Sequence, residues 1–387
     1  MKVLFLNYEY PPLGGGAGNA ASCILREFSK ISGLEVDFVT SSHDEDFHME
    51  EIGSGVIIHK LPIGKNRKNL HFQSEKDLLV YSWKAYWYSK KLIKQNKYDL
   101  SHSFFSVPCG FLSLVFKRKY KIPYVISLRG ADVPGYSERF SFLYKILAPL
   151  IKLIWKKSGA VVSNSEGLRE LALKSNPKQP IEIICNGIDT EKFKPGEPNR
   201  EKFIITLGGT RVTARKGIIY LIEAVHMLSQ KYPNVFLRVI GEGDEKNNLE
   251  KMSRKLEIGK KAEFLGRINN EEIPPYYQEA SVFVLPSLNE GMSNAMLEAL
   301  ASGLPIIATD TGGTEEIVKD GENGFVIKMK DSQDIADKIE ILIKDENLRR
   351  KMGENSRKRA ESMSWENVAK KYYNLYKKAT DDLSSRT

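Results

Sequence analysis

The sequence predicts an α/β protein in which two doubly wound domains face each other across a cleft. Short apolar runs typical of strands alternate with helical patterns along the chain, and this alternation indicates parallel sheets with helices on both faces. The length of 387 residues exceeds what one ordinary hydrophobic core accommodates. A polar stretch rich in Pro and Gly, near residues 191–201, interrupts the alternation, and we expect the interdomain linker there.

The expected strands form two groups. Those of the N-terminal domain are Val3–Asn7, Glu35–Thr40, Val56–Leu61, Asp99–Phe104, Pro123–Leu128 and Ala160–Ser163. Those of the C-terminal domain are Phe203–Leu207, Val235–Ile240, Ala262–Leu265, Ser281–Leu285, Pro305–Ala308 and Gly324–Ile327. We therefore expect an N-terminal domain over residues 1–196, a C-terminal domain over 197–362, and a last helix over 363–387 that crosses back to the N-terminal domain.

Composition indicates a globular protein from a reducing compartment. The three cysteines are far apart and have no metal-ligand spacing, so no disulfide framework is expected. No apolar segment is long enough for a signal peptide or a membrane span, since the longest, residues 140–155, is interrupted by Lys145, Pro149 and Lys152. We expect a cytoplasmic protein.

Positive charge is concentrated in the first half of the chain. Residues 60–157 hold 20 Lys and Arg against 5 Asp and Glu, which predicts an anionic partner for this half. Two segments here, Leu78–Tyr98 and Phe140–Lys157, mix aromatic, aliphatic and Lys residues at helical spacing. Either the apolar residues face the core, or the helices bind an anionic membrane surface, on whose inner face the protein would be peripheral. No nucleic-acid motif is visible.

A glycine-rich loop follows the first strand, in the segment "NYEYPPLGGGAGNAA". Gly15 and Gly16 would allow a ligand to approach the backbone, and a helix is expected to start near Asn19. The segment lacks the G-x-G-x-x-G spacing of dinucleotide-binding proteins. A tight turn and a ligand-binding loop are about equally supported.

Two cations precede a predicted helix in "LGGTRVTARKGIIYLIEA". Arg211 and Lys216 lie at the helix start, where their charges oppose the helix dipole unless an anion binds there. The segment therefore predicts a phosphate site, with a solvated basic loop as the alternative.

Two carboxylates flank a second helix start in "LPSLNEGMSNAMLEALASGLPIIATDTGG". Glu290 lies just before the helix and Glu298 about two turns into it. The residues between them offer backbone amides to an anion: Gly291, Met292, Ser293 and Asn294. If the two cations neutralise a phosphate, the carboxylates can bind hydroxyls. A nucleoside diphosphate sugar has this arrangement, although ordinary surface charges remain the alternative.

An acidic segment, "SSHDEDFHMEE", contains a D-x-D pattern, which binds a metal ion in some enzymes. Asp44 and Asp46 form this pattern, with His43 and His48 beside it. We expect a solvated loop here rather than a metal site, and no metal cofactor.

"NEGMSNAMLEA" resembles the E-x7-E element of retaining glycosyltransferases of family 4, which have the GT-B fold. Further motifs similar to that family follow in the expected order over the whole chain: "PPLGGGAGNAA", "VVSNSEGLRE", "ICNGIDTEKFKP", "GTRVTARKG", "VIGEGDE", "FLGRI" and "ATDTGGTEEIVKDGENGFV". The resemblance implies that Glu290 contacts hydroxyls of the donor sugar and Glu298 contacts the ribose. It implies that Arg211 and Lys216 bind the diphosphate and stabilise the leaving group.

The resemblance also assigns more peripheral contacts. The amides from Gly291 to Asn294 would hold sugar and phosphate oxygens, and Gly15 and Gly16 would close over the phosphate and acceptor side. A segment beside the base would contain Phe264, Gly266 and Arg267.

One position departs from the family pattern on the acceptor or sugar side. In "SLRGADVPGY", Arg129 stands where family members often have His, while Gly130 and Asp132 keep the pattern. Arg129 could face an anionic group or form a structural ion pair.

The resemblance therefore implies a metal-independent, retaining glycosyltransferase of polysaccharide or glycolipid biosynthesis. It would move a sugar from a nucleotide-sugar donor, with UDP favoured, to a glycan or lipid-linked acceptor. The alternatives are a sugar-nucleotide epimerase or phosphorylase on the same fold, and a non-catalytic protein that binds membranes or polyanions. The set Arg211, Lys216, Glu290 and Glu298 argues against the epimerase and the non-catalytic protein.

Overall fold

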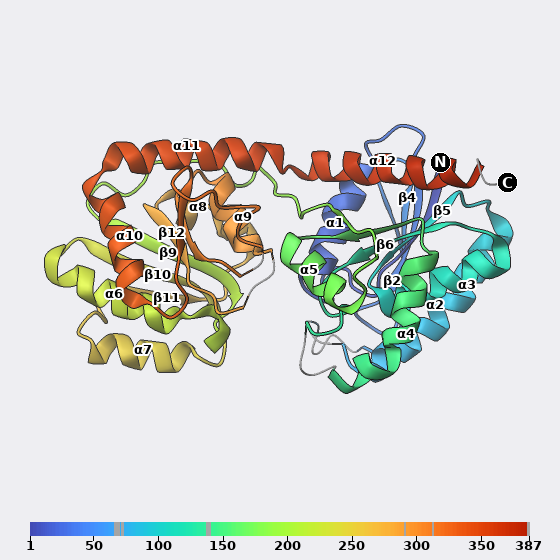
Figure 1. The fold of residues 1–387 in the computed structure, drawn as a ribbon, viewed down its shortest axis with the longest axis horizontal. Helices are drawn as coiled ribbons and strands as arrows, with labels where there is room; N and C mark the ends of the chain where they lie inside the picture. The colour runs from blue at the N-terminus through green and yellow to red at the C-terminus, as the bar shows by residue number, and fades with distance from the viewer. Residues whose placement is uncertain (66–69, 71–72, 137–140, 290–291, 312, 385–387) are drawn as a thin grey trace. The chain divides into compact units, whose positions relative to one another are not determined.

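The computed structural model describes residues 1–65, 70, 73–136, 141–289, 292–311 and 313–384. Its contacts divide the chain into two compact units (Figure 1). The N-terminal unit comprises residues 1–186 and 365–387, and the C-terminal unit comprises residues 187–364. The sequence placed these boundaries after residues 196 and 362.

The segment after Asn186 packs with the C-terminal unit. The guanidinium of Arg357 donates hydrogen bonds to the carbonyl oxygens of Thr190 and Phe193, at 2.9 and 3.0 Å. Pro195 lies against Gly303, where an added Cβ would be 3.0 Å from the proline ring. These contacts explain why the structural boundary comes ten residues earlier than the Pro/Gly-rich composition suggested.

The N-terminal unit contains an eight-stranded sheet in the order β3-β4-β2-β1-β5-β6-β7-β8. Its strands are β1 (Lys2–Leu6), β2 (Glu35–Ser41), β3 (His48–Ile52), β4 (Val56–Leu61), β5 (Leu100–Phe104), β6 (Tyr124–Leu128), β7 (Ala160–Ser163) and β8 (Glu182–Ile183). All pairs are parallel except β3–β4, which is antiparallel. The six expected strands are confirmed to within one residue at each end, whereas β3 and β8 were not predicted.

The helices of this unit are α1 (Gly16–Phe28), α2 (Glu75–Gln95), the π-helical turn η1 (Ser106–Gly110), α3 (Phe111–Tyr120), α4 (Ser141–Lys157), α5 (Glu166–Ser175) and α12 (Trp365–Ser384). Helix α1 begins at Gly16, three residues before the expected start. Helix α2 begins with a capping box, in which Ser74 and Asp77 satisfy each other's backbone amides. Helix α12 lies beside α1 (Figure 1), with its Tyr376 ring 5.7 Å from that of Phe28.

The C-terminal unit contains a parallel six-stranded sheet in the order β11-β10-β9-β12-β13-β14. Its strands are β9 (Phe203–Arg211), β10 (Val235–Glu242), β11 (Ala262–Gly266), β12 (Val282–Leu285), β13 (Ile306–Thr309) and β14 (Gly324–Ile327). All six were expected, although β9 extends four residues beyond its predicted end at Leu207. Buried apolar side chains fill the inner strands β9, β10, β12 and β13, as expected for a sheet covered on both faces, whereas the apolar residues of the edge strand β11 are half-buried.

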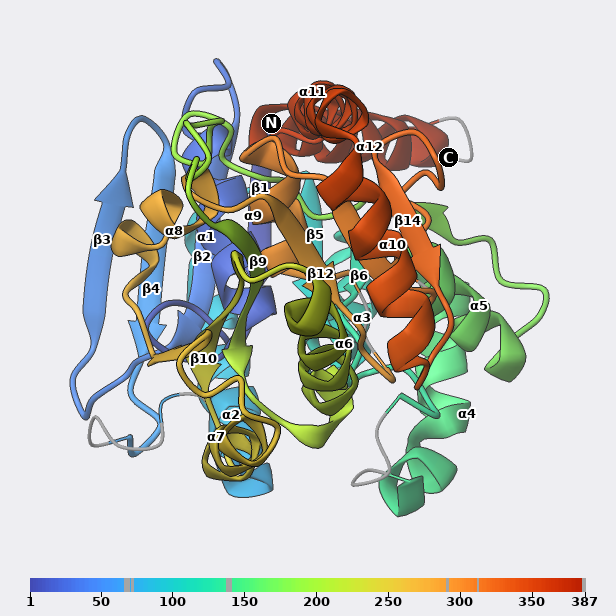
Figure 2. The same cartoon turned by 90° about the vertical axis from the view of Figure 1, so that its left-hand side faces the viewer.

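The helices of the C-terminal unit are α6 (Ile218–Lys231), α7 (Lys246–Lys255), α8 (Pro274–Gln278), α9 (Asn294–Ala301), α10 (Ser332–Lys344) and α11 (Glu346–Ser362). Helices α6 and α10 pack side by side, and α9 packs against α11 (Figure 2). Strand order reverses between β9 and β12, so right-handed crossovers place α6 and α9 on opposite faces of the sheet. Such a reversal is where doubly wound sheets bind ligands, beyond the carboxyl ends of the strands.

Within the described part of the chain, no helix combines the length and the apolar content that crossing a bilayer requires.

Candidate functional site

The two predicted cations lie at the carboxyl end of β9. Arg211 is the last residue of this strand and is exposed. Lys216 ends the 3-10 turn η3 (Ala214–Lys216), directly before α6, and only 9% of it is exposed. The structure therefore places both side chains in the connection that leads from β9 to the start of α6.

This connection is joined to the loop that follows the neighbouring strand β12. The N–H of Leu288 donates a hydrogen bond to the carbonyl oxygen of Arg215, at 2.7 Å. Gly217, with φ of +62°, lies so close that an added Cβ would be 2.1 Å from the carbonyl oxygen of Pro286. Backbone thus packs on backbone, which fixes the turn containing Lys216 against the loop that leads to α9.

Helix α9 begins at this loop. Ser293 is its N-cap and accepts a hydrogen bond from the N–H of Met296 at 3.4 Å. Met292 and Ser293 are buried, and Asn294 is exposed. Because the helix starts at Asn294, Glu298 lies just over one turn into it, and the expected two turns are wrong. Glu290 and Gly291 lie outside the described residues.

Glu298 is half-buried and receives a hydrogen bond from the hydroxyl of Tyr277 at 3.1 Å. Burial raises the pKa of the Glu298 carboxyl to about 7, while the bond from Tyr277 opposes this rise. The contact requires a glycine at position 208, since an added Cβ there would lie 2.1 Å from the Tyr277 hydroxyl oxygen. Sequence reasoning missed Tyr277, because no motif spacing connects it to Glu298.

Two buried hydroxyls on the same loops lack a hydrogen-bond partner within the described residues. They are the side chains of Thr213, between the two cations, and Ser287, in the loop after β12. A buried hydroxyl without a partner costs free energy, so a polar ligand at these loops would find groups ready to bond it. Sequence reasoning did not single out either residue.

The segment expected beside the base lies at the carboxyl end of β11, an edge strand two places from β9. Gly266 has φ of +71°, and an added Cβ would lie 3.0 Å from the carboxylate of Glu242. This carboxylate forms an ion pair with Lys246 at 3.1 Å. Phe264 is half-buried and Arg267 is exposed.

The glycine-rich loop of the N-terminal unit holds a carboxylate of its own. Oε2 of Glu9 accepts a hydrogen bond from the N–H of Gly15 at 3.2 Å, where α1 begins. Burial raises the pKa of this carboxyl, and bonds from the N–H groups of Gly15 and Gly18 oppose the rise. The N-terminus of α1, where Gly15 and Gly16 were expected to meet a phosphate, therefore already has a carboxyl group bound to it.

Arg129 is engaged by uncharged groups. Its guanidinium donates to Oδ1 of Asn186 at 3.0 Å and to the hydroxyl of Tyr372 at 3.1 Å, and it lies 3.5 Å from the ring centroid of Phe104. Among the described residues no carboxylate forms an ion pair with it. Of the two alternatives for Arg129, the structural ion pair is therefore absent from the described part of the chain. The Nε atom is buried without a hydrogen-bond partner.

Asp132 is buried and belongs to the same loop. Its carboxylate accepts hydrogen bonds from the N–H of Arg129 at 2.9 Å and from the N–H and hydroxyl of Ser106 at 2.8 and 2.9 Å. These bonds fix the backbone that carries Arg129.

Two family models cover nearly the whole chain. Residues 14–192 match Glycosyltransferase Family 4, and residues 187–359 match Glycosyl transferases group 1. An uncharacterized glycosyltransferase of Methanocaldococcus jannaschii is 30% identical, in an alignment that covers 98% of this chain and 99% of that protein. The chain belongs to glycosyltransferase family 4.

Solved structures show the same fold as this glycosyltransferase. Sucrose-phosphate synthase from Thermosynechococcus elongatus has a TM-score of 0.81 and is 22% identical, with both chains covered completely. Anabaena HepE, solved in complex with UDP and glucose, has a TM-score of 0.69 and is 19% identical, again with both chains covered completely. These similarities establish the GT-B fold, which consists of two Rossmann-like domains.

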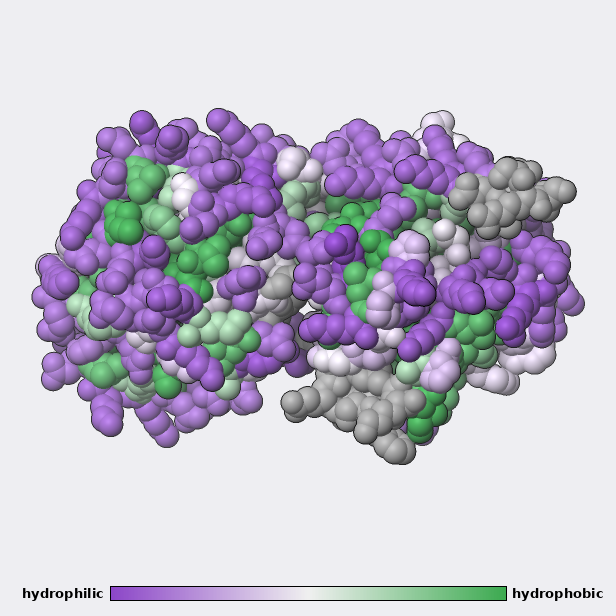
Figure 3. Space-filling model, in the orientation of Figure 1, coloured by the Kyte–Doolittle hydropathy of each residue, from purple (hydrophilic) through white to green (hydrophobic). Residues whose placement is uncertain are grey.

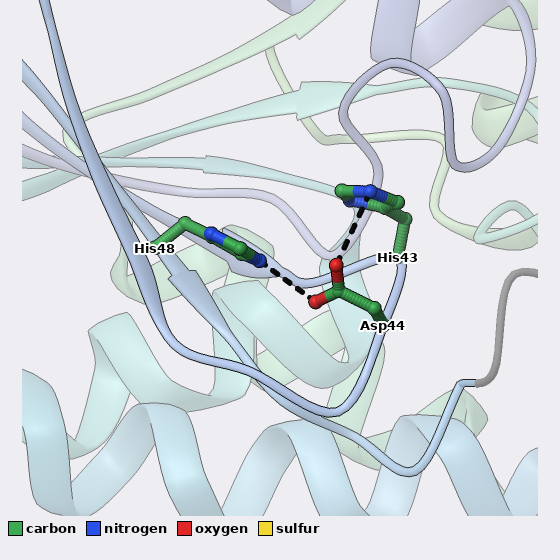
Figure 4. A group of neighbouring side chains, drawn as sticks. All are labelled: His43, Asp44 and His48. Atoms are coloured by element: carbon green, nitrogen blue, oxygen red, sulfur yellow. Dashed lines mark hydrogen bonds and ion pairs between the residues drawn. The ribbon is translucent and has the colours of Figure 1, made fainter.

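Asp44 departs from the solvated loop that was expected for the acidic segment of the glycosyltransferase. Only 7% of Asp44 is exposed, and its carboxylate lies between the imidazoles of His43 and His48 (Figure 4). Hydrogen bonds from His48, Ser42 and the N–H of Asp46 hold this carboxylate and keep its pKa well below the usual range. Glu45 and Asp46 are exposed, as expected.

Proposed function

We propose that this glycosyltransferase transfers a sugar from a UDP-sugar to a glycan or lipid-linked acceptor, with retention of configuration and without a metal. The observation that carries the proposal is the hydrogen bond between Leu288 and Arg215, because it joins the Arg211–Lys216 turn to the loop leading into α9. Cations, helix-start amides and buried unpaired hydroxyls are thereby gathered beyond two adjacent strands of one sheet.

The residue types suit the chemistry of a departing nucleoside diphosphate. Arg211 and Lys216 would stabilise the charge that develops on the leaving group, which is the role that a metal ion has in other transferases. Loss of one such preorganised group typically costs about 10²–10³ in rate. Glu290 would bind hydroxyls of the sugar and Glu298 those of the ribose. Retention follows from the resemblance to family 4.

The choice of UDP is supported by the Anabaena HepE structure, which contains UDP and glucose. In this chain the base would lie near Phe264 and Arg267, where a half-buried ring and an exposed guanidinium could both stack on it.

Thermal unfolding in EDTA with UDP, GDP or ADP tests the donor site. A nucleotide at 100 times its dissociation constant stabilises the unit that binds it by about 2.7 kcal/mol, which at roughly 2–4 °C per kcal/mol is a rise of several degrees. We expect UDP to give this rise in the native protein and Lys216→Ala to abolish it.

Arg215→Ala is the matched control. It also removes one positive charge, but from an exposed side chain that directly precedes Lys216. It should keep the response to UDP. A rise that appears only with Mg²⁺ or Mn²⁺, or that Lys216→Ala leaves unchanged, would contradict the proposed site.

The acceptor side of the proposal includes an anionic membrane surface. Leu79, Trp83 and Trp87, spaced four residues apart along α2, form one exposed row that we call the α2 ridge. Their exposed fractions are 72, 65 and 50%. Of the two alternatives for this segment, packing of the apolar residues against the core therefore does not hold for the α2 ridge.

Basic residues surround the α2 ridge. Lys76, Lys84, Lys91 and Lys94 lie on the same helix, and the Lys90 ammonium lies 4.5 Å from the ring centroid of Trp87. Hydrophobic residues reach the surface over the part of the N-terminal unit where α2 and α4 lie (Figure 3). Tryptophan and lysine on one helix face favour the interface of an anionic bilayer, where each Lys adds about 1 kcal/mol.

Vesicle sedimentation tests the membrane surface. We expect binding to vesicles with 30 mol% phosphatidylglycerol, weak binding to pure phosphatidylcholine, and loss of binding in Trp83→Ser/Trp87→Ser. Met329→Ser/Ile341→Ser, which removes two exposed apolar residues of the C-terminal unit, is the control and should bind as the native protein does. Equal sedimentation of both double variants would contradict the assignment.

A further inference from the structure

A cluster of potential metal ligands lies in the N-terminal unit, outside the residues assigned to the donor. It consists of His43, Asp44 and His48, in the connection from the end of β2 to the start of β3 (Figure 4). Each residue offers one ligand atom, and these atoms all lie within 4.8 Å of one another.

The carboxylate of Asp44 is the centre of the cluster. Its Oδ1 lies 2.7 Å from Nε2 of His48, and its Oδ2 lies 3.4 Å from Nε2 of His43. The two imidazole rings are stacked, with centroids 5.7 Å apart. Ser42 and the N–H of Asp46 donate hydrogen bonds to Oδ1 and so orient the carboxylate from outside the cluster. Both histidines therefore direct Nε2 toward one buried carboxylate.

The surrounding charge favours a cation. Residues 31–59 contain seven Asp and Glu and no Lys or Arg, within a protein whose net charge is +9. Lys60, which stands opposite His48 in the β3–β4 pair, forms an ion pair with Glu50. Apart from Asp44, the acidic residues of the connection are exposed and raise the local negative potential without occupying the cluster.

We propose that His43, Asp44 and His48 bind a zinc ion that fastens the end of β2 to the edge strand β3. Two imidazoles and one carboxylate match the ligands that Zn²⁺ takes, whereas Mg²⁺ and Ca²⁺ select oxygen ligands. Water would complete the coordination. This site is independent of the proposed function, because none of its residues is assigned to the donor or to the leaving group.

Zinc binding requires the three side chains to rearrange. Zinc bonds of about 2.0–2.2 Å place two ligand atoms of a tetrahedral site roughly 3.4 Å apart. Nε2 of His43 lies 3.4 Å from Oδ2 of Asp44, Nε2 of His48 lies 2.7 Å from Oδ1, and no two of the three ligand atoms are more than 4.8 Å apart. The ion would replace the His48–Asp44 hydrogen bond.

The strand that the ion would hold lacks strong anchors of its own. Strand β3 is antiparallel and lies at the sheet edge, and its polar sequence HMEEI has no buried residue. Within the described part of the chain, Glu50 of β3 forms an ion pair with Lys60 of β4. A metal at His48, the first residue of β3, would fix the strand where it begins.

Isothermal titration of tag-free protein, first stripped with EDTA, tests the site. We expect one Zn²⁺ per chain and no heat from Mg²⁺ or Mn²⁺ at the same concentration. Asp44→Asn and His48→Ala should each weaken Zn²⁺ binding at least tenfold. Thermal unfolding of the metal-free variants checks that they are folded, and in the native protein it should show a rise of the midpoint with Zn²⁺.

Two control variants separate this site from its neighbours. His226→Ala removes a histidine of the C-terminal unit, and Asp46→Asn removes the exposed second carboxylate of the D-x-D pattern. Both should bind Zn²⁺ as the native protein does. The proposal is overturned if the native protein binds no Zn²⁺, if His48→Ala retains native affinity, or if the bound metal is Mg²⁺ or Mn²⁺ and depends on Asp46.

Discussion

Tyr277 in α8 donates a hydrogen bond to Oε2 of Glu298 in α9, at 3.1 Å. The two residues come from separate crossovers of the C-terminal sheet, and Gly208 in β9 leaves the space that their contact occupies. Burial raises the pKa of Glu298 to about 7, so this carboxyl changes its charge near neutral pH. The free protein therefore keeps a partly desolvated acid at the position where we propose that the ribose binds.

Glu298→Gln should stabilise the free protein at alkaline pH. A carboxyl whose pKa is raised from 4.5 to about 7 on folding stabilises the fold when protonated, and this stability is lost as pH rises through that window. Ionisation at pH 8 then costs about 3 kcal/mol, at 1.36 kcal/mol per unit. The variant, which cannot ionise, should gain up to this amount at pH 8 and nothing at pH 4.5, as measured by urea denaturation.

Glu272→Gln, at an exposed position, is the control and should show no such pH dependence. The same Glu298→Gln protein should bind UDP more weakly. Identical stability of native and Glu298→Gln protein at pH 8 would contradict the raised pKa, whatever happens to nucleotide binding.

Tyr277→Phe should lower the free energy of unfolding, and by more at alkaline than at acidic pH. The Tyr277 hydroxyl stabilises the ionised form of Glu298, so its removal should raise the carboxyl pKa further. We expect a loss of roughly 1–3 kcal/mol at pH 8, the usual cost of a buried charged group that loses a hydrogen bond, and a smaller loss at pH 5. Adding Glu298→Gln should remove most of this pH dependence, and an additive double variant would argue against the contact.

Most strands could be predicted from the sequence because the apolar pattern of a strand is a local property. Apolar runs such as Val56–Leu61 and Gly324–Ile327 predicted β4 and β14 to the residue. Strand β3 was missed because HMEEI has a mostly polar, exposed surface and is stabilised by pairing with β4. Local patterns could not reveal that pairing.

The candidate site also contains residues that local patterns could predict and residues that only the folded chain reveals. Charge at helix starts predicted an anion site at Arg211 and Lys216, since dipole and anion binding are local effects. Tyr277 and Glu9 could not be found in this way, because each acts on a group that only the folded chain brings near. Asp44 was misjudged for a related reason: its own segment is acidic, but the ring of His48, four residues away, buries it.

Gly217→Ala should destabilise the C-terminal unit by more than its backbone conformation alone explains. The residue has φ of +62°, and its added Cβ would lie 2.1 Å from the carbonyl oxygen of Pro286. A left-handed alanine costs roughly 1–2 kcal/mol. The clash must in addition separate the Lys216 turn from the loop after β12, so UDP binding should weaken as well.

Gly321→Ala is the matched control for this prediction. Gly321 has φ of +76° and no atom within 4 Å of an added Cβ, so it measures the conformational cost alone. Thermal unfolding and UDP titration of both variants check the expectation. If the two substitutions lower stability equally and leave UDP binding intact, the close packing at Pro286 does not hold the site together.

Arg129 and Tyr372 should be energetically coupled within the N-terminal unit. The guanidinium of Arg129 donates to the Tyr372 hydroxyl at 3.1 Å, and that hydroxyl also lies 3.0 Å from the hydroxyl of Ser127 in β6. Tyr372 belongs to α12, so Arg129 links the end of β6 to a helix 243 residues further along the chain. Arg129→Met would leave Oδ1 of Asn186 and the Tyr372 hydroxyl without this donor.

We expect Arg129→Met to cost roughly 1–3 kcal/mol in urea denaturation, because hydrogen bonds from a charged, part-buried donor are lost. In a double-mutant cycle with Tyr372→Phe the two losses should be non-additive by about 0.5–3 kcal/mol. Coupling within this range would identify Arg129 as a structural link between β6 and α12. Strict additivity, together with reduced turnover in Arg129→Met, would instead favour a contact between Arg129 and an anionic group of the substrate.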